Sequence, residues 1–192
     1  MSASGSLPCW KFHLSYLPKL PCGFKSSKKL RKIKMAIEAY KPEKMLWTDK
    51  DFEQMGWHDN PIHALAFQPE SHEVSLDIDY IFKWEQPLSG ENHYRFWISP
   101  ATLVFEDVFD LKVNHDGYAG LTILGIERRE TGKPELRFPK KIWKWRIDCG
   151  EAKWELCATG YRQLIRKPPE LLGRQLLTYE QRGGYVLSCP KT

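Results

Sequence analysis

The chain has 192 residues, 42% of them hydrophobic and eight of them tryptophan, and it carries a net charge of +5. That length fits one domain, and so many large apolar side chains can fill a core without a disulfide or a metal, which excludes a chain disordered over most of its length. The longest apolar stretches are only a few residues, far short of the ~20 that a membrane-spanning helix requires, so we expect a soluble, cytosolic protein without membrane contact.

The first 34 residues differ from the rest of the sequence. They hold eight lysines and arginines and no acidic residue, which leaves 21 basic and 24 acidic residues, a net charge of −3, for residues 35–192. Three prolines interrupt any helix here, so we expect residues 1–34 to be a basic, disordered extension, or an upstream stretch ahead of a true start at Met35. Lysines at this density can bind a polyanion. A nucleic-acid-binding domain carries its positive charge on the fold itself, so we expect residues 35–192 to form one β-rich domain that does not bind nucleic acid.

A short helical signal follows the basic segment. Thr48 can cap a helical turn, Asp51 and Glu53 lie in its first part, and Gly56 can end it. The hydrophobic period then changes to two, which is typical of half-buried strands. A strand over residues 62–67 leads through the polar turn "QPESHE" into the next strand, which predicts a hairpin.

The next segment, "VSLDIDYIFKW", gives the clearest alternation in the chain. It predicts a long strand with one face buried and the other exposed to solvent, Ile81 being the exception to the pattern. The apolar face contains Val74, Leu76, Ile78, Tyr80, Phe82 and Trp84. The polar face contains Ser75, Asp77, Asp79, Lys83 and Glu85.

The remaining segments predict several more short strands separated by turns. We expect "HYRFWI" to be closed by Pro100, "ATLVFEDVFDLKV" to form two extended runs, "HDGYAG" to be a turn, "LTILGIER" to be a strand, and "YVLSC" to be the last strand. A hairpin is expected around "CGEA", with Trp143, Trp145 and Ile147 facing Trp154, Leu156 and Ala158. Helical character is expected near Glu170–Leu177 or in "TYEQR", ended by Gly183 and Gly184. The predicted fold class is therefore mainly β (α+β), an antiparallel sandwich, open barrel or strongly bent sheet of seven or eight strands with one or two short helices.

The five cysteines do not form a metal-binding pattern. They are widely spaced and include no C-x-x-C pair, which zinc ribbons and fingers need. We expect reduced, packed thiols in a cytosolic protein. A disulfide between Cys149 and Cys157, facing one another across the expected hairpin, is the alternative.

The stretch "GWHDNPIHALAF" contains the first candidate binding residues. His58 and His63 are five residues apart, so on a strand they lie on opposite faces, and Pro61 between them excludes a continuous helical turn. Asp59 suits a turn in which its carboxylate accepts local backbone N–H groups. We therefore interpret this stretch as a structural turn, with Trp57 and Ile62 packing inward and His63 projecting from the strand, and keep a binding surface as the alternative.

Charged side chains supply the other candidates. Asp77 and Asp79, with Glu85 further along the same face, are spaced to serve acid–base chemistry or to bind a divalent cation, but we favour a solvated strand face neutralised across strands by Arg95 or Lys83. A basic cluster near the C-terminus can receive phosphate or an acidic partner, but we favour its complementing the acidic strand face. That cluster comprises Arg162, Arg166, Lys167 and Arg182. No phosphate-binding glycine loop or nucleophile motif is present, so we assign no catalytic residue, metal or cofactor.

The order of "WHD", a short apolar strand, "VSLDIDYIFKW" and "ATLVFEDVFDLKV" resembles small uncharacterised bacterial proteins that open with an aromatic–His–Asp turn. It is also similar to some immunity proteins of polymorphic toxin systems, in which an element like "TLVFEDV", Thr102 to Val108, follows. The similarity covers Trp57 to Val113, about a third of the chain, and the long C-terminal part departs from the pattern. The resemblance implies a cytosolic protein that neutralises an enzyme by covering it, and it carries over no active-site residue.

Three functions therefore compete. The first is a non-enzymatic interaction domain that binds another protein, as the many tryptophans and tyrosines favour. The second is a small hydrolase or ligand-binding protein that uses His58, Asp59, Asp77 and Asp79. The third is polyanion binding through the basic N-terminal arm, Lys25 to Lys34.

Overall fold

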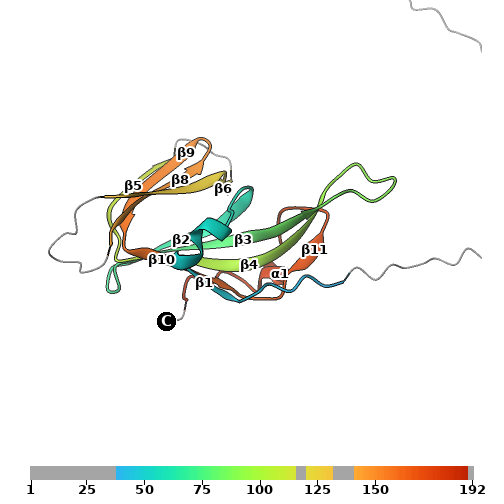
Figure 1. Cartoon of the computed structure of the whole chain (residues 1–192), viewed down its shortest axis with the longest axis horizontal. Coiled ribbons are helices and arrows are strands. Elements are labelled where there is room, and N and C mark those ends of the chain that lie inside the picture. The colour runs from blue at the N-terminus through green and yellow to red at the C-terminus, as the bar shows by residue number, and fades with distance from the viewer. Residues whose placement is uncertain (1–37, 116–119, 132–140, 190–192) are drawn as a thin grey trace, which may run out of the picture. The chain divides into compact units, whose positions relative to one another are not determined.

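The computed structural model describes residues 38–115, 120–131 and 141–189, and strands make up 54% of them. The protein is mainly β, as predicted, with one antiparallel sheet curled into a half-barrel, a second antiparallel sheet and two short helices (Figure 1). No helix in these ranges is long and apolar enough to cross a membrane. The predictions for residues 1–34 and for most of the "HDGYAG" turn lie outside the described residues.

The larger sheet has seven strands in the order β1-β10-β4-β3-β2-β6, and β11 pairs with β4 beside β10. Its strands are β1 (Leu46–Thr48), β2 (Asn60–Gln68), β3 (Glu73–Glu85), β4 (Arg95–Glu106), β6 (Thr122–Ile123), β10 (Gly160–Ile165) and β11 (Glu170–Leu172). The smaller sheet has the order β5-β9-β8-β7. Its strands are β5 (Phe109–His115), β7 (Gly125–Glu130), β8 (Trp143–Cys149) and β9 (Ala152–Ala158). The described residues thus hold eleven strands rather than seven or eight, because three of them have only two or three residues each.

The main core lies where the inner faces of the two sheets meet. The hairpin β8–β9 has the predicted register, with Trp145 opposite Leu156 and Ile147 opposite Trp154. These side chains are almost fully buried and belong to the same cluster as Leu76 of β3. Burying so many large apolar side chains between two curved sheets supplies most of the favourable free energy of folding.

The first helix, η1 (Asp49–Gln54), is a 3₁₀ helix that begins as predicted after Thr48. The carboxylate of Asp51 accepts hydrogen bonds from the Thr48 backbone N–H (2.8 Å) and from Lys44 Nζ (2.5 Å). Burial alone would raise the pKa of Asp51. The hydrogen bonds from Lys44 and Thr48, together with the charge of Lys44, lower it by more than burial raises it, so the net pKa shift is downward. Asp51 therefore stabilises the folded chain as an ionised cap.

Replacing Asp51 with asparagine is expected to lower the free energy of unfolding by about 1 kcal/mol at neutral pH. Because the folded-state pKa lies below the ordinary value, this contribution is present above that ordinary value and is lost as the pH falls through the lowered pKa. Urea unfolding of both proteins at a series of pH values should show the difference shrinking below about pH 3.5. Glu53→Gln is the matched control, since Glu53 lies on the same helix with 85% of its side chain exposed. An undiminished difference in acid would contradict the role of the charge.

The alternation predicted for β3 holds only as far as Ile81. The pairing of β3 with β4 shifts by one residue between Ile81 and Lys83, which is a β-bulge. Phe82 still packs against the main core, but Trp84, predicted on the same buried face, lies opposite Phe96 with 42% of its surface exposed. A one-residue shift reverses the faces of all the side chains beyond it, so the prediction for Trp84 is wrong.

Two other predictions at strand ends are corrected. Pro100 does not close a strand but lies inside β4, where its carbonyl accepts a hydrogen bond from Arg166 N (2.9 Å). Pro100 therefore lies opposite the residues between β10 and β11. No described strand is paired with it on that side, so the N–H that proline lacks is not required for a strand hydrogen bond. Residues 185–189, expected to form the last strand, are irregular.

The second helix is α1 (Tyr179–Arg182), within "TYEQR" rather than at Glu170–Leu177, and Gly183 ends it with a φ of 74°.

The hairpin β8–β9 does not place Cys149 and Cys157 opposite one another. Cys149 pairs with Ala152 and Cys157 with Lys144, so the disulfide alternative fails on register. Burial raises the pKa of the Cys149 thiol to about 11, which keeps it protonated and poorly nucleophilic at neutral pH.

Candidate functional site

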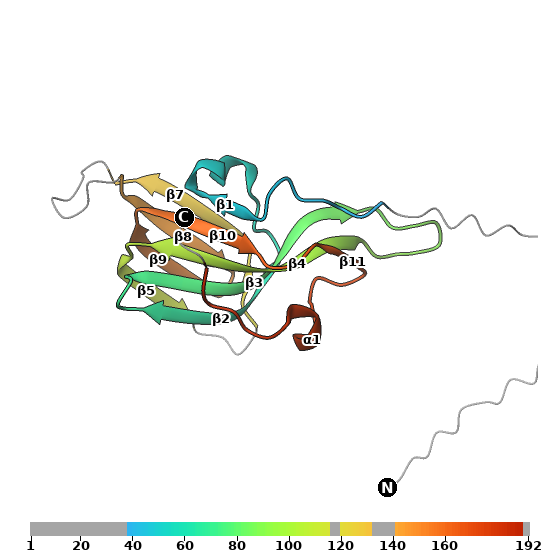
Figure 2. The same cartoon turned by 90° about the horizontal axis from the view of Figure 1, so that it is seen from below.

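The polar face of β3 is covered by the C-terminal residues 173–189, called the strap below. Figure 2 shows this segment running from β11 through α1 and across the seven-stranded sheet. Thr102 Oγ1 donates to the Val186 carbonyl and Gln68 Nε2 to the Leu187 carbonyl, each at 2.8 Å. The strap also adds Leu177 to a small apolar cluster with Ile81, Phe96 and Ile98.

Beneath the strap lies a buried charge centre made of Asp77, Asp79, His63, Arg166 and Arg182. Arg166 donates to both carboxylate oxygens of Asp77 (2.8 and 3.2 Å), and Arg182 spans Asp77 and Asp79 with its two Nη atoms. His63 Nε2 lies 2.8 Å from Asp79 Oδ2. Both aspartates are 0% exposed. The expectation of a solvated face is therefore wrong for both aspartates, and Lys83 pairs with Glu85 (2.8 Å) rather than with either of them.

Backbone amides of the strap complete the coordination of the two aspartates. Leu177 N donates to Asp79 Oδ2 (2.9 Å), and Val186 N donates to Asp77 Oδ2 (2.8 Å). The prediction that the C-terminal arginines complement the acidic strand face is confirmed for Arg166 and Arg182. Each carboxylate therefore has charged and neutral donors around it, as a buried anion requires.

The other members of the predicted basic cluster have separate partners. Arg162 is 2% exposed and pairs with Glu73 (3.0 Å) and Glu106 (2.7 Å). Lys167 Nζ donates to the Gln181 carbonyl at 2.6 Å, which ties β10's continuation to α1. These basic side chains are engaged within the fold, so they do not form an open anion-binding surface.

The "WHD" turn is structural at Trp57 and exposed at His58. Trp57 is buried and donates from Nε1 to Gln163 Oε1 (2.8 Å), as its inward packing predicted. Asp59 adopts a φ of 64°, a left-handed conformation that aspartate tolerates better than most residues. Its carboxylate, expected to accept local backbone amides, contacts Gln175 Nε2 (3.0 Å) and His58 Nδ1 (3.2 Å). His63 projects from β2, and its Nε2 lies 2.8 Å from Asp79 Oδ2.

Three exposed rings lie together beside this turn and form what we call the aromatic face: His58, Trp84 and Tyr94. The Trp84 ring lies 6.3 Å from His58 and 5.8 Å from Tyr94, measured between ring centroids. Phe96 supports Trp84 from below at 5.2 Å. Trp84 and Tyr94 are 42% and 43% exposed, and they lie on either side of the loop that joins β3 to β4, which projects away from the sheet (Figures 1 and 2).

An open hollow of about 320 Å³ joins the aromatic face to the strap. Tyr94 and Phe96 line it from the hairpin, and Arg174 and Gln175 line it from the strap. Leu88 near the hairpin tip and Leu176 on the strap are each 51% exposed. The hydrogen bond from Gln175 to Asp59 ties the strap to the "WHD" turn, so three distant segments meet at this surface.

The geometry separates the predicted site residues into two groups. Asp77, Asp79 and His63 come together, with both aspartates fully buried and the His63 side chain 17% exposed, whereas His58 and Asp59 lie outside that centre. Within the ranges that the structure describes, no three His, Cys, Asp or Glu side chains are grouped so as to hold a metal ion. The site residues missed from the sequence are Trp84, Tyr94 and Gln175. For Trp84 and Tyr94 the available signal was the pair of aromatic residues that flank the polar loop "EQPLSGENH".

The fold and the site define a mainly β protein with a buried charge centre and an exposed aromatic face. No family model matches the chain, and no curated protein matches it.

Proposed function

We propose that the chain is a non-enzymatic, cytosolic protein-binding domain, immunity-like in that it binds and neutralises a partner, and that the aromatic face is its contact surface. The observation that carries this proposal is the exposure of Trp84 and Tyr94 side by side where the projecting loop joins β3 and β4. Tryptophan and tyrosine dominate the binding energy of protein interfaces because they bury a large area at a small entropic cost.

The packing of the aromatic face favours tight binding. Phe96 (5.2 Å) and His58 (6.3 Å) flank the Trp84 ring, which restricts the rotamers open to it before a partner binds. A preorganised side chain loses little conformational entropy on binding. The neighbouring hollow offers Arg174 as a donor for carboxylates or carbonyls of the partner. A surface with a rigid aromatic centre and a polar rim is typical of protein interfaces.

The buried charge centre supports a binding role over the hydrolase alternative. A general acid or base must come within hydrogen-bond reach of its substrate. Asp77 and Asp79 are fully buried and already accept hydrogen bonds from arginines and backbone amides. Substrate access to them would require the strap to leave the sheet.

The test is to co-express the full chain with the product of each reading frame that neighbours its own gene, and to score complex formation and protection of growth. For the complex recovered, Trp84→Ala is expected to raise the dissociation constant about 30-fold or more, since truncating an interface tryptophan costs about 2 kcal/mol or more. Isothermal titration calorimetry measures this change. Phe67→Ala is the matched control, because Phe67 is 56% exposed at the far end of β2 and should leave binding unchanged. Equal loss in both variants, or no complex with any neighbouring product, would overturn the proposal.

A further inference from the structure

Strand β7 forms one edge of the four-stranded sheet and pairs only with β8 among the described strands. Thr131 N donates to the Ile142 carbonyl (3.2 Å), which continues the register of the pair. Main-chain groups alternate in direction along a strand, so those of Gly125, Glu127 and Arg129 point toward β8. The N–H and C=O groups of residues 126, 128 and 130 therefore point outward, and they make β7 a template for another strand.

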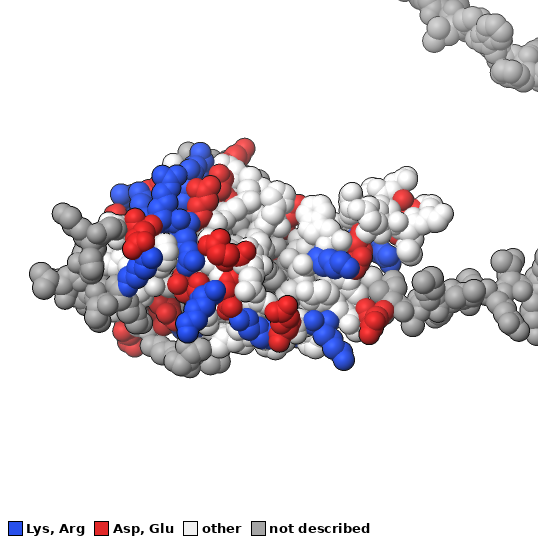
Figure 3. Space-filling view, in the orientation of Figure 1, with Lys and Arg blue, Asp and Glu red and all other residues white. Residues whose placement is uncertain are grey.

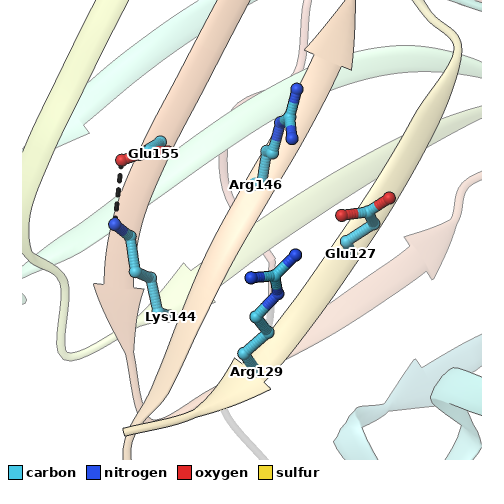
Figure 4. Close-up of a pocket in the computed structure, with 5 residues that line it drawn as sticks. All are labelled: Glu127, Arg129, Lys144, Arg146 and Glu155. Atoms are coloured by element: carbon cyan, nitrogen blue, oxygen red, sulfur yellow. Dashed lines mark ion pairs between the residues drawn. The ribbon is translucent and has the colours of Figure 1, made fainter.

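The outer face of this edge carries an unbalanced pattern of charge. Glu127 lies opposite Arg146, but Arg129 lies opposite Lys144, so its cross-strand partner carries a like charge. Lys144 already pairs with Glu155 at 3.0 Å. A shallow cavity of about 110 Å³ is lined by these two residues together with Glu127, Arg129 and Arg146 (Figure 4). Figure 3 shows basic side chains interspersed with acidic ones over this end of the molecule. A carboxylate on the open side of Arg129 would balance its charge.

We propose that β7 pairs antiparallel with β7 of a second copy of this chain, which joins two four-stranded sheets into one continuous sheet. Only registers that place the outward-pointing residues opposite one another can form main-chain hydrogen bonds. Of these, the register that forms the most main-chain hydrogen bonds, about six, sets Arg128 opposite Arg128 of the second copy and Ile126 opposite Glu130. The same register sets Glu127 opposite Arg129 twice, once on each side of the two-fold axis.

The side chain of Arg128 does not oppose this pairing. It turns inward, with its guanidinium 4.2 Å from the centroids of Phe52 and Trp143 and Nη1 2.5 Å from Asp49 Oδ1. Two Arg128 residues can thus lie opposite one another while their charges remain inside their own chains. The charge pattern of "IERRE" is therefore complementary to itself in the one register that the backbone favours most.

Two observations favour a second copy over an unrelated strand. The complementarity of Glu127 and Arg129 is isologous, which is the form that a two-fold homodimer requires. At the opposite edge of the same sheet, β5 is interrupted by a bulge between Phe109 and Lys112, with Asp110 at a φ of 48°. Bulges protect an edge from pairing, and β7 has none over Gly125–Glu130. This inference is independent of the proposed function, since β7 contributes no residue to the aromatic face.

The test is sedimentation equilibrium of the full chain at protein concentrations up to about 0.1 mM in about 0.15 M salt. The wild-type chain is expected to dimerise, and Glu127→Arg and Arg129→Glu are each expected to raise the dissociation constant about tenfold or more, because each sets like charges opposite one another twice. An equimolar mixture of the two variants is expected to recover the dimer, since every facing pair is then of opposite charge. The double variant should also dimerise as the wild type does.

Three results would overturn the proposal. A wild-type chain that stays monomeric at every concentration would refute the pairing and would leave the edge to a strand from a different protein. Single variants that dimerise like the wild type would place any dimer contact elsewhere. A mixture that stays monomeric, although circular dichroism shows both variants folded, would refute the register.

Discussion

Replacing Asp77 with alanine is expected to lower the free energy of unfolding by about 3–5 kcal/mol, the cost of removing one partner from a buried ion pair. Asp77 accepts hydrogen bonds from Arg166, Arg182 and the Val186 amide, and all of them lose their acceptor in the variant. The Arg182 side chain, 2% exposed in the folded chain, would be left beside Asp79 alone, with its charge only partly compensated. Urea unfolding followed by tryptophan fluorescence measures the change.

The control for this substitution is Glu53→Ala. Glu53 also pairs with an arginine, Arg128 at 3.5 Å, but its side chain is 85% exposed. Exposed ion pairs contribute little because water and salt screen them, so this variant should change the free energy of unfolding by less than about 0.5 kcal/mol. Equal effects of the two substitutions would mean that the charge centre is solvated in solution.

The charge centre was only half accessible to prediction from the sequence. Complementary charges on Asp77, Asp79 and the C-terminal arginines were visible, and their pairing was favoured on that ground. Their burial was not visible, because it depends on a segment about a hundred residues away, and Arg182 is separated from Asp77 by 105 positions. Alternation along a strand indicates that its two faces differ in polarity, but it does not indicate whether another segment covers the polar face.

Local geometry explains which parts of the fold were predicted. The turn between β8 and β9 is short, so it allows only one register in which the two rows of apolar side chains face each other. The sequence therefore predicts the pairing of Trp145 with Leu156 correctly. The bulge near Phe82 depends instead on how β3 and β4 curve together, and no residue type in "IFKW" requires it. Because the bulge reverses the faces, it alone moved Trp84 from the predicted core to the surface and created the aromatic face.

Ending the chain at Leu172 is expected to lower the free energy of unfolding by about 5 kcal/mol or more, which would leave the protein largely unfolded. The truncation removes Arg182 from both aspartates and the Leu177 and Val186 amides from their carboxylates. It also removes the Leu177 side chain from the small apolar cluster. Burying one leucine side chain contributes about 1.5–3 kcal/mol. Circular dichroism and the midpoint of urea unfolding measure the loss.

A chain that ends at Cys189 is the control, since it retains every strap contact described above and should unfold as the full chain does. A chain that ends at Gly183 should lie between the two, because it keeps Leu177 and Arg182 but loses the hydrogen bonds made by Val186 and Leu187. This graded order is expected if the strap stabilises the sheet through its contacts with the buried aspartates, Thr102 and Gln68 and through the burial of Leu177. If the chain ending at Leu172 unfolded at the same urea concentration as the full chain, the strap would be dispensable for folding, and a substrate could reach Asp77 and Asp79 without unfolding the sheet.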